Sequence, residues 1–152
     1  MLHRNPALLF NLATQLGPPA ADVIIRIWKE GWGNASAPKA DKLGRILAQL
    51  PNDAAIHFLS DESWRDSTTT ALLASARRFP ARALRVFAER VDRPGNKGAF
   101  LDHAQRHRDL TAAVHHELPA KARQLLTEAM PDLAACSTPD DASTPGSPTM
   151  PR

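Results

Sequence analysis

The chain has 152 residues, of which 43% are hydrophobic and 23% are charged, and its formal net charge is +3. This length fits one domain with a buried core, and the composition is that of an ordinary folded protein. The single cysteine, Cys136, excludes an intramolecular disulfide and any metal site built from several cysteines. No apolar run approaches the roughly 18 residues that a membrane span requires, so we predict a soluble, cytoplasmic protein without membrane contact.

Amphipathic helices are predicted in chain order. The first follows Asn5, a candidate N-cap, with Pro6 at the first helical position. Apolar stripes over residues 43–50 and 72–79 predict two further helices, and the hydroxyl side chains of residues 67–70 are N-cap candidates for the second of these. A longer helix is expected over about residues 99–117. The first stripe consists of Leu8, Leu9, Leu12, Ala13 and Leu16.

Four short segments share a pattern in which a proline is followed by alanine three residues later and by a large apolar residue seven residues later. Proline is tolerated in the first turn of a helix and disfavours helix at the residue before it, so each segment predicts a corner between two helices. We therefore expect an all-α fold: a short irregular α-solenoid, or a helical bundle, of stacked helical hairpins with proline-marked corners. The prolines are Pro18, Pro51, Pro80 and Pro119, the alanines are Ala21, Ala54, Ala83 and Ala122, and the apolar residues are Ile25, Phe58, Phe87 and Leu126.

Two of these corners, at residues 50–54 and 118–122, read Leu-Pro-x-x-Ala. This pattern resembles corners of HEAT-like helical repeats and of the N-terminal helical domain of MgtE-type magnesium transporters. The resemblance covers only these five-residue pieces, and it implies a fold and no function. We place the helical-repeat domain at residues 1–131 and a disordered tail rich in Pro, Ser and Thr at residues 132–152.

Positive charge is concentrated in the middle of the chain, where residues 71–131 carry eleven Lys and Arg against six Asp and Glu. Arginine forks bind phosphates and carboxylates, so this region predicts contact with an acidic partner or with nucleic acid. A solvated helix surface remains the alternative, and no aromatic residue interleaves the cations as a base-stacking platform would need. The candidate contacts are Arg77, Arg78, Arg82, Arg85, Arg90, Arg93, Lys97, Arg106 and Arg108.

Two tryptophans near predicted loops, Trp32 and Trp64, are candidate anchors for a protein partner, and capping of the helix stack is the alternative that we favour for Trp32. His103 and His107 have the spacing of two metal ligands on a helix, but the zinc-protease glutamate is missing, and we interpret them as surface histidines. His57 is expected to be half-buried. No phosphate-binding glycine loop or nucleophile motif is present, so we predict no catalytic residue, no cofactor and no metal.

These features favour a non-enzymatic protein-interaction module, such as an adaptor, inhibitor or accessory subunit. The alternative is a nucleic-acid-binding accessory protein that uses the arginines between residues 77 and 108. An enzyme whose catalytic groups converge from distant positions is the third hypothesis. The sequence leaves the oligomeric state and the identity of the partner open.

Overall fold

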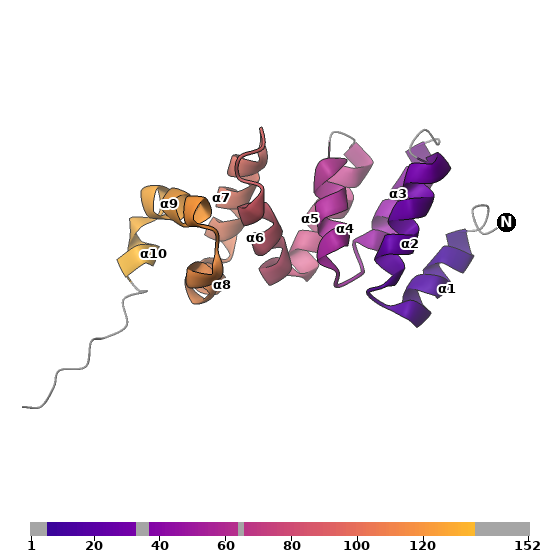
Figure 1. Cartoon of the computed structure of the whole chain (residues 1–152), viewed down its shortest axis with the longest axis horizontal. Coiled ribbons are helices and arrows are strands. Elements are labelled where there is room, and N and C mark those ends of the chain that lie inside the picture. Colours follow the sequence, from indigo (N-terminus) through magenta and orange to yellow (C-terminus); the bar gives the residue numbers. More distant parts are fainter. Residues whose placement is uncertain (1–5, 33–36, 64–65, 136–152) are drawn as a thin grey trace, which may run out of the picture.

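The computed structural model describes residues 6–32, 37–63 and 66–135. These residues form helices joined by turns, with no strand among them, which confirms the predicted all-α class. The helices succeed one another along the long axis of the molecule in chain order (Figure 1). They are α1 (Pro6–Leu16), α2 (Ala20–Ile27), the π-helical turn η2 (Trp28–Trp32), α3 (Ala37–Leu47), α4 (Asp53–Asp61), α5 (Asp66–Arg78), α6 (Pro80–Glu89), α7 (Asn96–Arg106), α8 (Arg108–Val114), the 3-10 turn η3 (His115–Glu117), α9 (Ala120–Ala129) and α10 (Pro131–Ala135).

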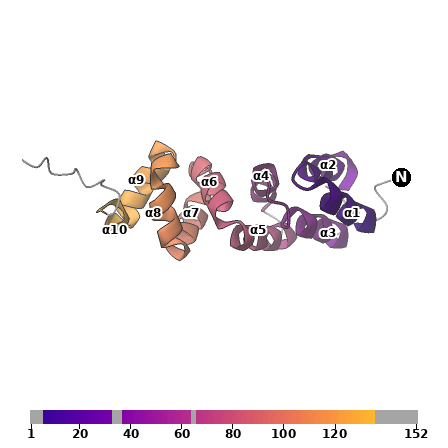
Figure 2. The same ribbon diagram turned by 90° about the horizontal axis from the view of Figure 1, so that it is seen from below.

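The first six helices form two layers. Each packs against the next helix in the chain, and α1, α3 and α5 also pack side by side, as do α2, α4 and α6. Figure 2 shows these two rows end-on. Contacts of this kind, between a helix and the next one or two helices in the chain, are those of an α-solenoid, so each helical hairpin buries its apolar face against the adjacent one.

The corners form where the prolines predict them, and the first two corners are hydrogen-bonded to each other. Asn52 follows Pro51 and caps α4, because its Oδ1 accepts a hydrogen bond of 2.7 Å from the backbone N–H of Ala54. Its Nδ2 donates to the carbonyl oxygen of Pro18 at 2.8 Å. One side chain therefore ends the α3–α4 corner and ties it to the α1–α2 corner.

The small alanine of the corner pattern lets helices approach closely at three of the four corners, where Ala21, Ala83 and Ala122 are fully buried. At the second corner Ala54 is only half-buried, because Asn52 occupies the cap and α4 begins two residues after Pro51. Ala55 takes the buried position there instead.

The start of α5 and the apolar stripe of α1 differ from those predicted. Helix α5 begins at Asp66, so residues 67–70 lie inside its first turns, and the hydroxyl of Thr70 donates to the carbonyl oxygen of Asp66 at 3.0 Å instead of capping the helix. In α1, Leu9 and Ala13 are buried, whereas Leu8 and Leu16 are exposed. Among the described helices, α1 is the first of the stack and packs mainly against α2 and α3.

The long helix expected over residues 99–117 is broken at His107, whose φ and ψ are −122° and 50°. Two helices and a 3-10 turn replace it. The hydroxyl of buried Thr111 holds the break, because it donates to the carbonyl oxygens of Ala104 at 3.2 Å and of His107 at 2.9 Å. These contacts supply a donor to carbonyl groups near the end of α7.

The helical part continues beyond residue 131, because α10 forms and its Leu133 is buried. From Cys136 onward the predicted tail lies outside the described residues. Within the described ranges, no helix has the length and apolar character that crossing a membrane requires.

Candidate functional site

The nine cationic residues proposed as partner contacts lie on successive elements from α5 to α8. Most of these side chains are paired with carboxylates of the same chain and are therefore not free to bind a partner. Six of them make ion pairs: Arg82, Arg85, Arg90, Arg93, Arg106 and Arg108.

Several of these ion pairs join neighbouring elements of the stack. Arg82 of α6 bonds Asp53 of α4 at 2.8 Å, and Arg85 of α6 bonds Glu117 of η3 at 2.8 Å. Arg90, just after α6, bonds both oxygens of Asp61 at the end of α4. These arginines therefore fasten α6 to its neighbours on either side.

Arg90 is the centre of a larger network. Its Nε donates to His57 Nδ1 at 2.7 Å, and His57 Nε2 lies 3.1 Å from Glu89. Asp61 also pairs with Arg93. The hydrogen bond from Arg90 is the largest cause that lowers the pKa of the Asp61 carboxyl below 3.8, and the charges of Arg90 and Arg93 add to it. His57 is half-buried, as predicted, and it is bonded on both ring nitrogens.

Three of the nine cations, Arg77, Arg78 and Lys97, make no ion pair with another described residue. Arg77 and Arg78 occupy the last turn of α5, where positive charge complements the helix dipole. The guanidinium of Arg78 also lies over the ring of Phe79, 5.7 Å from its centroid. These two arginines are therefore available to an anionic group that approaches the end of α5.

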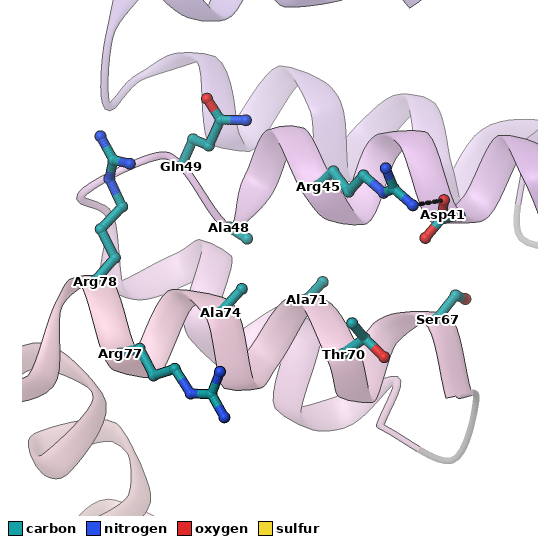
Figure 3. Close-up of a pocket in the computed structure, with 10 residues that line it drawn as sticks. All are labelled: Asp41, Arg45, Ala48, Gln49, Ser67, Thr70, Ala71, Ala74, Arg77 and Arg78. Atoms are coloured by element: carbon teal, nitrogen blue, oxygen red, sulfur yellow. Dashed lines mark ion pairs between the residues drawn. The ribbon is translucent and has the colours of Figure 1, made fainter.

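Arg77 and Arg78 lie at one end of a groove of about 460 Å³ between α3 and α5, which we call the α3–α5 groove. Figure 3 shows α3 and α5 running in the same direction, with Ala48, Ala71 and Ala74 pointing into the space between them. Asp41 and Arg45, paired at 3.0 Å, line the α3 wall. The groove thus combines a smooth apolar floor with free positive charge at one end.

The close approach of α3 and α5 has a local cause. Gly44 is buried in α3, and a Cβ built on it would lie 3.2 Å from the Cβ of Ala71 in α5. A larger side chain at either position would push the helices apart. Ala48, Ala71 and Ala74 line the groove beside this contact.

The α3–α5 groove continues into a hollow on each side. Gln49 also lines a cavity of about 190 Å³ between α1 and α3, the α1–α3 hollow. Arg77 also lines a cavity of about 280 Å³ between α5 and α7, the α5–α7 pocket. The two flanking cavities each contain an exposed large apolar side chain, Phe10 at 48% and Leu73 at 49% exposure. Three adjoining hollows therefore follow one another across α1, α3, α5 and α7.

His103 and His107 line the α5–α7 pocket. The prediction that both are surface histidines is wrong for His103, which is buried. Its Nε2 lies 2.9 Å from the carbonyl oxygen of Pro80, so α7 is fastened to the corner before α6. Burial lowers the pKa of His103 below 6.5, although the hydrogen bond to Pro80 opposes this shift. His107 is half-buried, with its ring 4.6 Å from that of His103.

The two tryptophans proposed as anchors fall outside the part of the chain that can be described: Trp64 entirely, and Trp32 in its side chain. The third, Trp28, is buried and packs edge-on against Phe58 with ring centroids 5.4 Å apart. Across the described ranges, no group of three or more His, Cys, Asp or Glu side chains is placed to hold a metal ion.

Sequence reasoning did not find the groove, although Gly44 and the alanines on α3 and α5 were visible signals of a close helix contact. These residues lie too far apart in the chain for their proximity to be read from spacing. Comparison of the chain with protein-family models, with curated proteins and with solved structures gives no significant match, so the candidate site is defined by its geometry.

Proposed function

We propose that this protein is a non-enzymatic interaction module that binds an acidic, extended segment of a partner protein along α1, α3, α5 and α7. The observation that carries the proposal is the α3–α5 groove, where an alanine floor leads to two arginines that no described carboxylate neutralises. One layer of helices in a solenoid commonly provides an extended binding surface of this kind.

Charge pairing favours a protein partner over nucleic acid. A protein that follows a phosphate backbone needs several free cations in register, and six of the nine candidates here are engaged with carboxylates. The two arginines at the end of α5 suit one or two carboxylates instead. The exposed apolar side chains of Phe10 and Leu73 on the flanking hollows add the apolar contacts typical of protein interfaces.

The size of the surface suggests the form of the ligand. Packed helices lie roughly 8–10 Å apart, so α1, α3 and α5, which pack side by side, span roughly 16–20 Å. An extended chain advances ~3.3 Å per residue, so about six residues cross these three helices, and a few more reach the α5–α7 pocket. Because adjacent hollows share a lining residue, Gln49 or Arg77, an extended segment that crosses the helices meets each hollow in turn.

The test is selection of peptides of about 12 residues from a random displayed library on the immobilised full chain. Selected peptides are then measured by fluorescence anisotropy against two variants. Ala74→Trp fills the groove from an exposed position of α5, and Ala113→Trp places the same side chain at an exposed position of α8. We expect selected peptides rich in Asp and Glu, and an affinity loss of roughly tenfold or more in Ala74→Trp only.

Failure to enrich any peptide, or peptides whose affinity survives Ala74→Trp, would overturn the proposal. Short duplex DNA and single-stranded RNA serve as competing probes in the same assay. Tight binding of either one, with a steep salt dependence that Arg77→Glu/Arg78→Glu removes, would replace the protein partner with nucleic acid.

A further inference from the structure

The α5–α7 pocket adjoins the α3–α5 groove, and its walls differ from the groove floor. Leu72, Leu73 and Ala76 of α5 and Phe87 of α6 form an apolar side. His103 faces them from α7, and its ring meets that of Phe87 edge-on with centroids 5.5 Å apart. The pocket therefore has an apolar side and one buried imidazole in its wall, and Asp102 and Arg106 of α7 also line it.

The hydrogen bond of His103 fixes which ring nitrogen carries the proton. A carbonyl oxygen only accepts, so Nε2 must donate to Pro80 O, and the neutral ring has its bare lone pair on Nδ1. No described group donates to that atom. Nδ1 of His103 can therefore accept a hydrogen bond from a ligand.

The volume and position of the pocket limit what it accepts. About 280 Å³ lies below the range of ~300–1,000 Å³ typical of cofactor and drug-sized ligands, which makes a single side chain the fitting occupant. Arg77 lines both this pocket and the α3–α5 groove. A segment held in the groove by its carboxylates therefore passes the mouth of the pocket.

On the basis of the proposed function, we propose that the bound segment carries one tyrosine or tryptophan side chain as an anchor. Its ring enters the α5–α7 pocket and its O–H or N–H donates to Nδ1 of His103. Acidic residues a few positions away pair with Arg77 and Arg78. Tyrosine and tryptophan combine a large apolar body with one donor, which is the combination that this cavity and this acceptor match.

The test uses synthetic peptides that contain one Tyr, followed two residues later by two Glu, with Ala and Ser elsewhere. Two further peptides carry Phe or Ala in place of Tyr. Fluorescence anisotropy against the full chain should give the tightest binding for Tyr. Phe should bind roughly fivefold more weakly, because one hydrogen bond is lost, and Ala more weakly still by a further factor of roughly ten or more.

Matched protein variants locate the anchor. Leu73→Ser removes an apolar wall of the pocket from a side chain that is 49% exposed, and Leu16→Ser makes the same change at 49% exposure in α1, away from the three hollows. Only Leu73→Ser should weaken the Tyr peptide. His103→Gln keeps an amide donor in reach of Pro80 and should reduce the preference for Tyr over Phe.

The outcomes separate the two proposals. Equal affinity for the Tyr and Phe peptides overturns the hydrogen bond to His103. If the Ala peptide binds as tightly as the Tyr peptide and remains sensitive to Ala74→Trp, the anchor is wrong while the groove function stands. If no peptide binds, and none is selected from the library, both proposals fall.

Discussion

Asp61 at the end of α4 and Arg90 just after α6 form a two-point ion pair, in which Arg90 Nη2 lies 3.0 Å from Asp61 Oδ2. The side chain of Arg90 is only 13% exposed, and His57 accepts its third hydrogen bond. The pair therefore joins two helices of the same layer through a largely buried guanidinium. Because Arg93 shares the same carboxylate, one acidic residue supports two arginines.

Replacing Asp61 with Asn should lower the free energy of unfolding by roughly 1–2 kcal/mol, because Arg90 loses its charged partner. The loss stays this small because the Asp61 side chain is 40% exposed and solvent screens its charge. Urea denaturation at neutral pH measures this change. Asp132→Asn breaks the long 3.9 Å contact with Arg108 and should change stability by less than about 0.5 kcal/mol. Equal effects of the two substitutions would contradict a special role for Asp61.

Stability should fall on acidification in two separate ranges. The pKa of His103 is lowered in the folded protein. Below pH 6.5 the unfolded chain therefore binds a proton at this residue before the folded chain does, and stability falls until the pH passes the folded-state pKa. The pKa of Asp61 is also lowered, so its stabilisation is present above 3.8 and is lost as the pH drops through its folded-state pKa.

His103→Gln separates the two ranges, because it removes the imidazole and leaves Asp61 unchanged. Urea midpoints between neutral and mildly acidic pH should depend less on pH in this variant than in the wild-type chain. The decline at the lower pH should persist in His103→Gln and disappear in Asp61→Asn. An unaltered pH dependence in His103→Gln would argue against burial as the cause.

Gly44→Val should destabilise the chain by roughly 1–3 kcal/mol. The new Cβ meets the Cβ of Ala71 at 3.2 Å, and the branched side chain adds two further carbons between α3 and α5. Gly98→Ala in α7 is the matched control, because its Cβ would have no atom within 4 Å and Ala favours helix. This second change should stabilise by about 0.5–1 kcal/mol in thermal unfolding. A tolerated valine at position 44 would mean that α3 and α5 separate easily.

Thr111→Val tests the break at His107 with almost no change in shape. The carbonyl oxygen of Ala104 loses the hydroxyl donor, whereas that of His107 keeps the backbone N–H of residue 111 at 2.8 Å, and the expected cost is roughly 1–2 kcal/mol. Thr127→Val removes a 3.0 Å bond to Arg123 at an exposed site of α9, where water replaces the hydroxyl. That control should alter stability by less than about 0.5 kcal/mol in the same denaturation experiment.

Local features of the sequence were enough to predict the class of fold. Pro51 and Pro80 act through their own rings on adjacent backbone, and an apolar stripe depends on residues three or four positions apart. For this reason the helices and their corners were predictable. The break at His107 was not, because residues 104–110 contain no proline or glycine that would signal it.

Only the tertiary structure decided which charges remain free and where a ligand has room. Arg82 finds Asp53 across 29 residues of chain, and Arg90 finds His57 across 33, so counting arginines could not separate the paired from the unpaired ones. The α3–α5 groove likewise depends on packing, because its walls come from two separate segments, residues 41–49 and 67–78. The sequence by itself determined the helices, through short-range backbone and periodicity effects. Their packing determined the site, because charge pairing, burial and cavity shape all depend on residues that are distant in the chain.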